Sequence, residues 1–186
     1  YTNQDIELFR SGEDPWEHPN TRWMDELVST WTTRSKHSLS LDGTFNDIQY
    51  YFSLGYRNEE AIYEQESTNY NQYNARAKLD VPVTDWMTVS YDFAGFQTNR
   101  VYPTKSAWSI YGQATRLVPT MHAFWPNGKP GPDIEYGDNP VVTSTFETGH
   151  DDEKHYKTQN TLRLQLNPLE NLDIEARYSY DVDNRY

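Results

Sequence analysis

The most regular feature of the sequence is an alternation of apolar and polar side chains with a period of two. It is clearest over residues 48–57, where Ile48, Tyr50, Phe52, Leu54 and Tyr56 alternate with Gln49, Tyr51, Ser53, Gly55 and Arg57. Successive side chains of a β-strand point to opposite faces of the sheet, so this pattern predicts a strand with one apolar face. Similar runs predict further strands at about residues 36–41, 72–81, 86–96, 157–167 and 171–182.

The lengths of these strands and of their connections indicate a membrane barrel. Strands of about 9–11 residues are long enough to cross a bilayer when tilted. The connections alternate between short turns (42–47, 82–85 and 168–171) and long loops (58–72 and 97–156). Short turns at one rim and long loops at the other are typical of bacterial outer-membrane barrels. The predicted fold class is therefore all-β: residues 35–186 are an antiparallel segment, of about six strands, of a large transmembrane β-barrel with long extracellular loops carrying short helices.

The first part of the chain does not alternate. Residues 5–10 have the composition of one or two helical turns, and Asn20 is suited to N-cap a helix over residues 21–31. Residues 106–116 of the long loop also have a helical pattern. Because residues 1–34 enter the first strand from the long-loop rim, they are predicted to be an extracellular loop segment with short helices.

Composition narrows the function. The chain has 28 Asp+Glu against 16 Lys+Arg, which argues against nucleic acid as a partner. It has no cysteine, so a disulfide framework and thiolate metal sites are excluded. Fifteen Tyr and six Trp accompany a mean hydropathy of −0.95, a combination expected of a barrel with aromatic girdles facing lipid and a polar face toward water. The first residues show no basic or apolar leader and the last follow a strand pattern, so we expect a segment of a longer protein.

Several short motifs resemble SusC-like TonB-dependent transporters. Residues 14–23 (DPWEHPNTRW) resemble that family's D-P-x-x-x-P-N-T-D-W segment. Three strand segments also resemble family motifs: 37–43 (HSLSLDG) resembles H-N-L-S-x-S-G, 50–56 (YYFSLGY) resembles Y-Y-x-S-L-G-Y, and 69–76 (NYNQYNAR) resembles N-Y-x-x-Y-N-x-R. In the long loop, 125–128 (WPNG) resembles W-P-x-G and 137–140 (GDNP) resembles G-x-N-P. The chain departs from the family pattern at Arg22 and at Phe45-Asn46. The resemblance extends, in order, over nearly the whole chain.

This resemblance implies a whole protein larger than this chain. Family members have a plug inside a barrel of about 22 strands. They pair with a SusD-like surface lipoprotein, and they import glycans, or peptides in some branches, with energy from the TonB complex. It implies a bacterial outer-membrane location and contact with outer-membrane lipid. It also implies that this chain carries roughly the second to seventh strands, and that TonB is contacted through parts that this chain lacks.

The long loop contains the candidate binding residues. Aromatic rings can stack on the apolar faces of sugar rings, and a histidine can bind hydroxyls. The candidates are Trp108, Tyr111, His122, Phe124, Trp125 and Tyr136. The alternative is that these side chains pack the loop on itself, because a long ordered loop needs a small core of its own.

The charged positions of the strands are predicted to face the barrel lumen. These residues are Arg76, Lys78, Asp80, Arg163, Asp173, Glu175 and Arg177. An Arg or Lys facing lipid at mid-depth would cost about 2–4 kcal/mol. We therefore expect these side chains to meet water and the plug.

Neither catalysis nor a cofactor is predicted. The carboxylates cluster at 59–66, 133–138 and 151–153, but no spacing matches an EF-hand calcium loop, so solvated charge is the default interpretation. The five His residues show no metal spacing. Two other classes are alternatives: a soluble carbohydrate-binding β-sandwich and a surface glycosidase with paired carboxylates. A sandwich would show shorter strands and more frequent turns.

Overall fold

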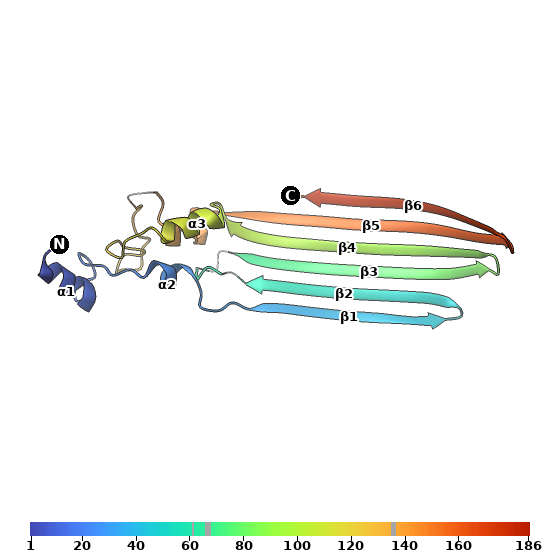
Figure 1. The fold of residues 1–186 in the computed structure, drawn as a ribbon, viewed down its shortest axis with the longest axis horizontal. Helices are drawn as coiled ribbons and strands as arrows, with labels where there is room; N and C mark the ends of the chain where they lie inside the picture. Colours follow the sequence, from blue (N-terminus) through green and yellow to red (C-terminus); the bar gives the residue numbers. More distant parts are fainter. Residues whose placement is uncertain (61, 66–67, 135–136) are drawn as a thin grey trace. The chain divides into compact units, whose positions relative to one another are not determined.

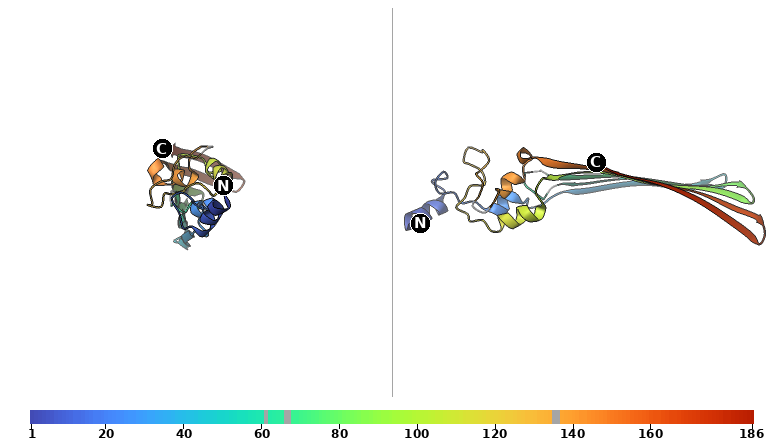
Figure 2. Two further views of the ribbon diagram at one scale, coloured as in Figure 1. Left: turned by 90° about the vertical axis from the view of Figure 1, so that its left-hand side faces the viewer. Right: turned by 90° about the horizontal axis from the view of Figure 1, so that it is seen from above.

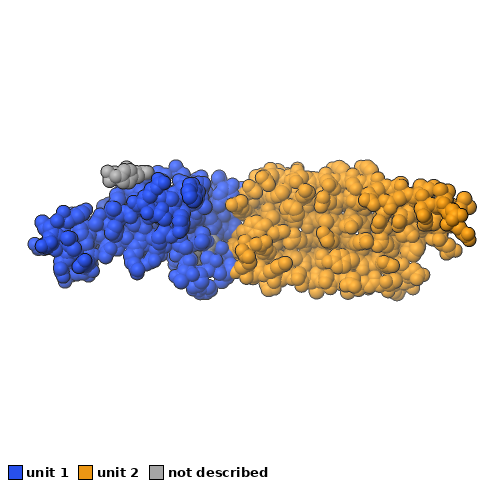
Figure 3. Space-filling model, viewed as in Figure 1, with its two compact units in different colours: residues 1–33, 60–69, 101–152 blue, residues 34–59, 70–100, 153–186 orange. Residues whose placement is uncertain are grey.

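The structure, a computed structural model, describes residues 1–60, 62–65, 68–134 and 137–186. The chain divides into two units, shown in two colours in Figure 3. The sheet unit comprises residues 34–59, 70–100 and 153–186, and the loop unit comprises residues 1–33, 60–69 and 101–152. Each unit is described by itself.

Six antiparallel strands form one sheet in the order β1-β2-β3-β4-β5-β6, so that each strand pairs with its neighbours in sequence (Figure 1). The strands are β1 (Arg34–Phe45), β2 (Ile48–Glu60), β3 (Asn69–Thr84), β4 (Met87–Pro103), β5 (His150–Leu169) and β6 (Leu172–Arg185). Seen from above, the strands twist and curve along their length (Figure 2), as barrel walls do. This sheet, which is not closed in this segment, confirms the predicted fold class.

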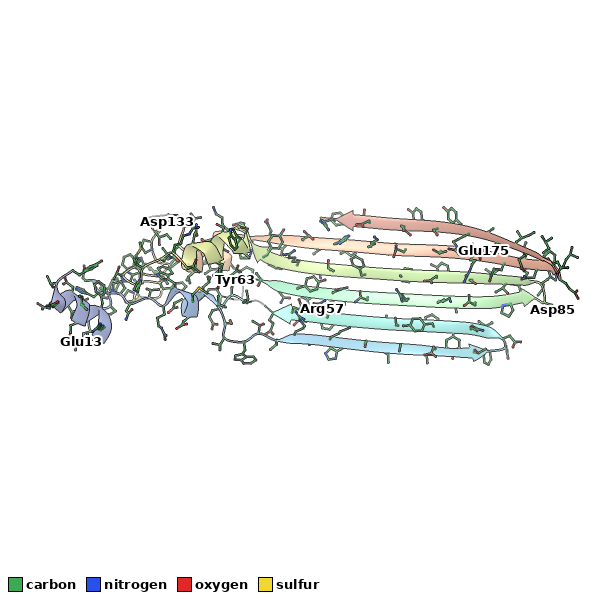
Figure 4. All side chains as sticks on the ribbon, viewed as in Figure 1. Glu13, Arg57, Tyr63, Asp85, Asp133 and Glu175 are labelled. Carbon is green, nitrogen blue, oxygen red and sulfur yellow. The ribbon has the colours of Figure 1, made fainter. Side chains whose placement is uncertain are left out.

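The hairpins at one end of the sheet are tighter than predicted. Asn46 and Asp47 have φ angles of 48° and 66°, as a two-residue type I′ turn requires. Two residues also separate β3 from β4, where Figure 4 labels Asp85, and β5 from β6. The predicted turn at 42–47 is therefore too wide: Gly43 is still paired with Tyr50. The turns predicted at 82–85 and 168–171 are likewise shorter, because backbone pairing continues up to the last possible residue.

The strands are also longer than predicted at their loop ends. β4 continues to Pro103 and β5 begins at His150, so the long loop comprises residues 104–149 rather than 97–156. Polar side chains on one strand bond to each other there: Gln97 Nε2 donates to Asn99 Oδ1 at 3.1 Å and Gln72 Nε2 to Asn74 Oδ1 at 2.8 Å. The apolar alternation therefore ends before the backbone pairing does.

The register gives the sheet one apolar face. Leu39 lies opposite Leu54 across β1 and β2, and Leu164 lies opposite Ala176 across β5 and β6. Leu39 is 71% exposed and Leu54 62% exposed within the chain. An exposed apolar surface of this extent requires an apolar medium or partner, which for a barrel wall is lipid.

The loop unit contains short helices. They are α1 (Asn3–Ser11), α2 (Trp23–Leu27), α3 (Ala107–Ala114), α4 (Pro140–Thr143) and the 3-10 turn η1 (Phe146–Thr148). α1 begins with a capping box between Thr2 and Asp5. α3 is N-capped by Ser106, whose Oγ accepts from Ser109 N at 3.2 Å. The helix predicted over 21–31 is wrong in length. No side chain caps α2, and the chain turns extended at Val28, which bridges to Tyr63.

A small hydrophobic core holds the loop unit together. It comprises Trp23, Leu27, Tyr63, Ile110, Ala114, Ala123, Ile134 and Val141. Leu27 and Val141 are completely buried and Ile110 is 1% exposed. Among the residues that the structure describes, every member of this core belongs to the loop unit. The loops therefore fold around their own interior.

Charge is distributed very unequally between the units. Sixteen of the 28 acidic residues and five of the 16 basic residues lie in the sequence ranges of the loop unit. The loop unit thus carries a formal charge of −11, whereas the whole chain carries −12. In the described part of the chain, no helix is both long enough and apolar enough to cross a membrane.

Candidate functional site

The motif at residues 14–23 fastens the N-terminal segment to the long loop. Thr21 N donates to Pro119 O at 2.8 Å, and the Thr21 hydroxyl donates to Met121 O. The indole Nε1 of Trp23 donates to Val118 O at 2.8 Å while its ring is buried in the core. The Thr and the Trp of the motif thus have a structural role.

Three rings from these two segments form an aromatic cluster. Trp16 stacks on Trp125 with ring centroids 6.0 Å apart and planes 25° apart, and His122 lies 4.5 Å from Trp125. His122 Nε2 donates to Pro15 O at 2.9 Å, which fixes the imidazole against the N-terminal segment. Trp16 remains 51% exposed, so the cluster presents an aromatic surface to solvent. Trp16 is not among the binding residues predicted from the sequence, because its contact with Trp125 joins two segments that are far apart along the chain.

Asn139 holds the backbone beneath this cluster. Its Nδ2 donates to Ala123 O at 2.9 Å and to His122 O at 3.2 Å. Its Oδ1 accepts from Val141 N at 3.1 Å and from Val142 N at 3.3 Å, which caps α4. The side chain is 2% exposed. The asparagine of the GDNP motif therefore joins two stretches of the loop.

The predicted binding residues do not all come together. Trp108 is 84% exposed and Tyr111 is 48% exposed, both on α3. Phe124 packs against the core, and Tyr136 lies outside the described residues. Of the predicted set, the structure joins His122 and Trp125.

A polar cavity of about 520 Å³ lies elsewhere in the loop unit, between residues 29–33 and the described residues among 60–69. Ser29 N donates to Ile62 O at 2.9 Å and Glu64 N donates to Leu27 O at 3.0 Å, which holds the segments side by side. The Ser29 hydroxyl also donates to Glu64 Oε2 at 2.7 Å. The cavity, named here the Trp31 cavity, is lined by Ser29, Thr30, Trp31, Thr32, Thr33, Glu60, Tyr63, Glu64, Thr68 and Asn69.

Two aromatic residues line this cavity in different ways. Tyr63, labelled in Figure 4, is 5% exposed, and burial raises the pKa of its phenol. Trp31 is 78% exposed. Tyr63 therefore belongs to the wall, whereas the Trp31 ring is exposed within this chain.

An ionic cluster lies at the N-terminal segment. His18 Nδ1 lies 2.9 Å from Asp14 Oδ2, and His18 Nε2 lies 3.5 Å from Asp5 Oδ1. The hydrogen bond to Asp14, with a smaller contribution from Asp5, raises the pKa of His18 above its ordinary value of 6.5. The same bond lowers the pKa of Asp14, while bonds from Thr2 and then His18 lower the pKa of Asp5.

The predicted lumenal charges include paired side chains. Asp80 lies 3.4 Å from Lys78 Nζ and 3.7 Å from Arg163, whereas Arg177 lies 2.8 Å from Glu175 on the same strand. The register places Arg163 opposite Arg177, so these residues share the face opposite the leucines. Figure 4 labels Arg57 and Glu175, which lie on β2 and β6. Among the described residues, no three His, Cys, Asp or Glu side chains converge as a metal site.

The sheet, its two-residue turns and its self-contained loop core define the class: this is a segment of the wall of an outer-membrane β-barrel. The sequence is 26% identical over 194 aligned residues to the TonB-dependent receptor P26 of Formosa agariphila, covering 99% of this chain and 18% of that protein. The structure of the RagAB peptide transporter matches with a TM-score of 0.69 and 17% identity, over 98% of this chain and 22% of the matched chain. The RagAB peptide importer in its open-open state matches with a TM-score of 0.70 and 19% identity, over 91% and 19%. No family model matches the sequence.

The match to the receptor sequence and the matches to the solved structures confirm the resemblance to SusC/RagA-like TonB-dependent transporters, and with it the outer-membrane location. The chain spans about a fifth of the length of the proteins that it matches. Their names are those of a receptor and of transporters, which agrees with a role other than catalysis.

Proposed function

We propose that the full-length protein containing this chain is a TonB-dependent outer-membrane importer of oligosaccharides that works with a SusD-like surface lipoprotein. The observation that carries the proposal is the fold: a six-stranded meander with two-residue turns at one end, matched to RagAB over 98% of the chain. The importing activity, the substrate and the lipoprotein partner are those of the family that the motifs resemble.

In this proposal the loop unit is extracellular and supplies ligand contacts. Exposed aromatic rings support a glycan substrate, because indole and phenol rings stack on the apolar faces of sugars. Trp108, Tyr111, His122 and Trp125, together with Trp16, are the aromatic side chains proposed to contact ligand or the lipoprotein. Tyr136 and Phe124, the latter packed against the core of the loop unit, complete the proposed set.

The sheet has a different part in the same proposal. Its leucine-rich face meets lipid, and its charged face meets the plug and the aqueous lumen. Opposite charges on that face pair across strands, as Asp80 and Arg163 do at 3.7 Å. The plug and the TonB contact are proposed to belong to parts of the protein outside this chain.

An importer of peptides is the second candidate, because the solved structures that match are those of a peptide transporter. One experiment separates the two. Cells that carry or lack the full-length gene are fed fluorescent oligosaccharides or oligopeptides, with and without a working TonB complex. Oligosaccharide uptake that needs both the gene and TonB is the expected result. Uptake of peptides alone would replace the glycan proposal, and uptake independent of TonB would refute the importer proposal.

A further inference from the structure

We infer that the Trp31 cavity is a binding site for a neutral oligosaccharide, in which Trp31 stacks on a sugar ring and Glu64 accepts hydrogen bonds from sugar hydroxyls. This inference rests on the proposed import function and adds to it a location and a preference for uncharged sugars. The cavity is separate from the Trp16–Trp125 cluster, with which it shares no lining residue.

The size of the cavity fits a short saccharide. Ligand sites usually enclose about 300–1,000 Å³, and this cavity measures about 520 Å³. Its two walls are fixed by backbone bonds from Ser29 N to Ile62 O, from Glu64 N to Leu27 O, and from Glu60 N to Thr33 O at 3.1 Å. These bonds hold the described parts of the two walls together without a ligand.

Trp31 is the clearest sign of a ligand. A side chain this large and apolar is usually buried for most of its surface, yet it is 78% exposed beside a cavity whose other walls are mainly polar. The flat apolar face of a pyranose can cover an indole, while its hydroxyls remain free to bond at the ring edge. A saccharide thus satisfies the ring and the polar wall together.

The polar wall offers groups that suit hydroxyls. Among the described lining residues, Ser29, Thr30, Thr32, Thr33 and Thr68 carry aliphatic hydroxyl groups, and Asn69 adds an amide. Glu64 is held in place by the Ser29 hydroxyl at 2.7 Å. An ionised carboxylate has about four acceptor positions on its two oxygens, so Glu64 can accept from sugar hydroxyls as well as from Ser29. Hydrogen bonds to a charged acceptor are stronger than neutral ones.

Charge then selects among sugars. The described lining residues include two carboxylates, Glu60 and Glu64, and no Lys or Arg. The surrounding loop unit carries a formal charge of −11. A uronate or a sulfated sugar would be repelled within the Debye length of about 8 Å at physiological salt. Neutral sugars avoid this repulsion and keep the carboxylate hydrogen bonds.

The test uses the purified full-length transporter in detergent. Binding is measured by thermophoresis against neutral hexasaccharides of glucose, xylose, mannose and galactose, against hexagalacturonate, and against a lysine-rich hexapeptide. The variants are Trp31→Ala, Trp31→Phe and Glu64→Gln. The controls are Trp86→Ala, an exposed tryptophan at a turn of the sheet unit, and Glu26→Gln, an exposed carboxylate of the loop unit outside the cavity.

At least one neutral hexasaccharide should bind wild type and bind Trp31→Ala at least about tenfold more weakly, with partial recovery in Trp31→Phe. Glu64→Gln should weaken the neutral sugar severalfold and narrow its advantage over hexagalacturonate. Both controls should match wild type. The inference is overturned if no neutral hexasaccharide binds, if hexagalacturonate or the peptide binds more tightly, or if Trp31→Ala binds like Trp86→Ala. A neutral sugar that is imported without any effect of Trp31 would overturn this site and leave the import function intact.

Discussion

Replacing Asn139 by Ala should loosen the part of the long loop that carries His122 and Trp125. The substitution removes a helix N-cap, worth about 1 kcal/mol, because Val141 N and Val142 N lose their acceptor. It also removes the Nδ2 bonds to the carbonyl oxygens of His122 and of Ala123, the latter of which keeps its bond from Gly131 N. Each lost bond costs about 0.5–1.5 kcal/mol, or about 1–3 kcal/mol for the two. The free energy of local opening should therefore fall by about 3 kcal/mol.

Hydrogen exchange followed by mass spectrometry measures this change in the full-length transporter. A loss of about 3 kcal/mol corresponds to amide exchange on the order of 100-fold faster over residues 122–143. Asn139→Ser should recover about 1 kcal/mol, because a serine restores the cap but is too short to reach the Ala123 carbonyl. Peptides from the sheet unit should exchange as in wild type.

Asn127→Ala is the matched control. Asn127 accepts from Lys129 N at 3.1 Å in an exposed turn of the same loop, and its loss should change local stability by less than about 0.5 kcal/mol. If residues 122–143 exchange no faster in Asn139→Ala than in this control, the buried amide does not hold the loop together and the reasoning above is wrong.

Three further predictions address other parts of the molecule. Gly131→Ala should lower the thermal stability of the loop, measured by limited proteolysis, because a Cβ there would overlap the backbone carbonyl oxygen of His122; an unchanged cleavage rate would contradict this. His18 has a raised pKa, so its ionic contacts should stabilise the N-terminal segment fully below pH 6.5 and less as the pH rises through the folded pKa. Protection factors of residues 3–18, which correct for the intrinsic pH dependence of amide exchange, should fall over that interval in wild type but not in His18→Gln. Equal profiles would count against the contacts. Leu164→Arg should destabilise the barrel in lipid by about 2–4 kcal/mol, because it places a charge on the lipid face of the sheet. Gln165→Arg should not, because residue 165 lies on the opposite face of the sheet, across from Glu175. Heat-modified electrophoretic mobility measures the stability of both variants, and equal losses of stability would refute the assignment of the two faces.

The sheet could be predicted from sequence because its signal is local. Alternation at residues 48–57 reports directly which side chains share a face, and the observed register places Phe52 and Leu54 opposite leucines of β1. The ends of the strands next to the loops could not be predicted, for a physical reason. Near the loops both faces meet polar surroundings, so residues such as Gln97 and Asn99 no longer alternate although their backbone remains paired.

The loop unit was less predictable because its contacts join distant segments. The short helix at 107–114 follows from its Ser106 cap, which the sequence displays. The partnership of Trp16 with Trp125 and the cavity between residues 29–33 and 60–69 depend on which loops fold together. A single sequence carries no signal for such contacts. The predicted helix over 21–31 therefore included Trp31, whereas the observed helix α2 ends four residues earlier, at Leu27.

The loop core also bears on the order in which the sheet can form. In this meander every strand pairs with its neighbour in sequence, and three of the pairings are closed by two residues. Joining β4 to β5 instead closes a connection of 46 residues (104–149), which on entropy alone costs about 3 kcal/mol more than closing a two-residue turn. Inside the loop, Gly149 and Thr104 lie close enough that a Cβ on the glycine would be 3.6 Å from the threonine methyl group. A loop that has folded around Val141 and Ile110 therefore brings its own ends together, and the hairpins on either side can then join along β4 and β5 as if the connection were short.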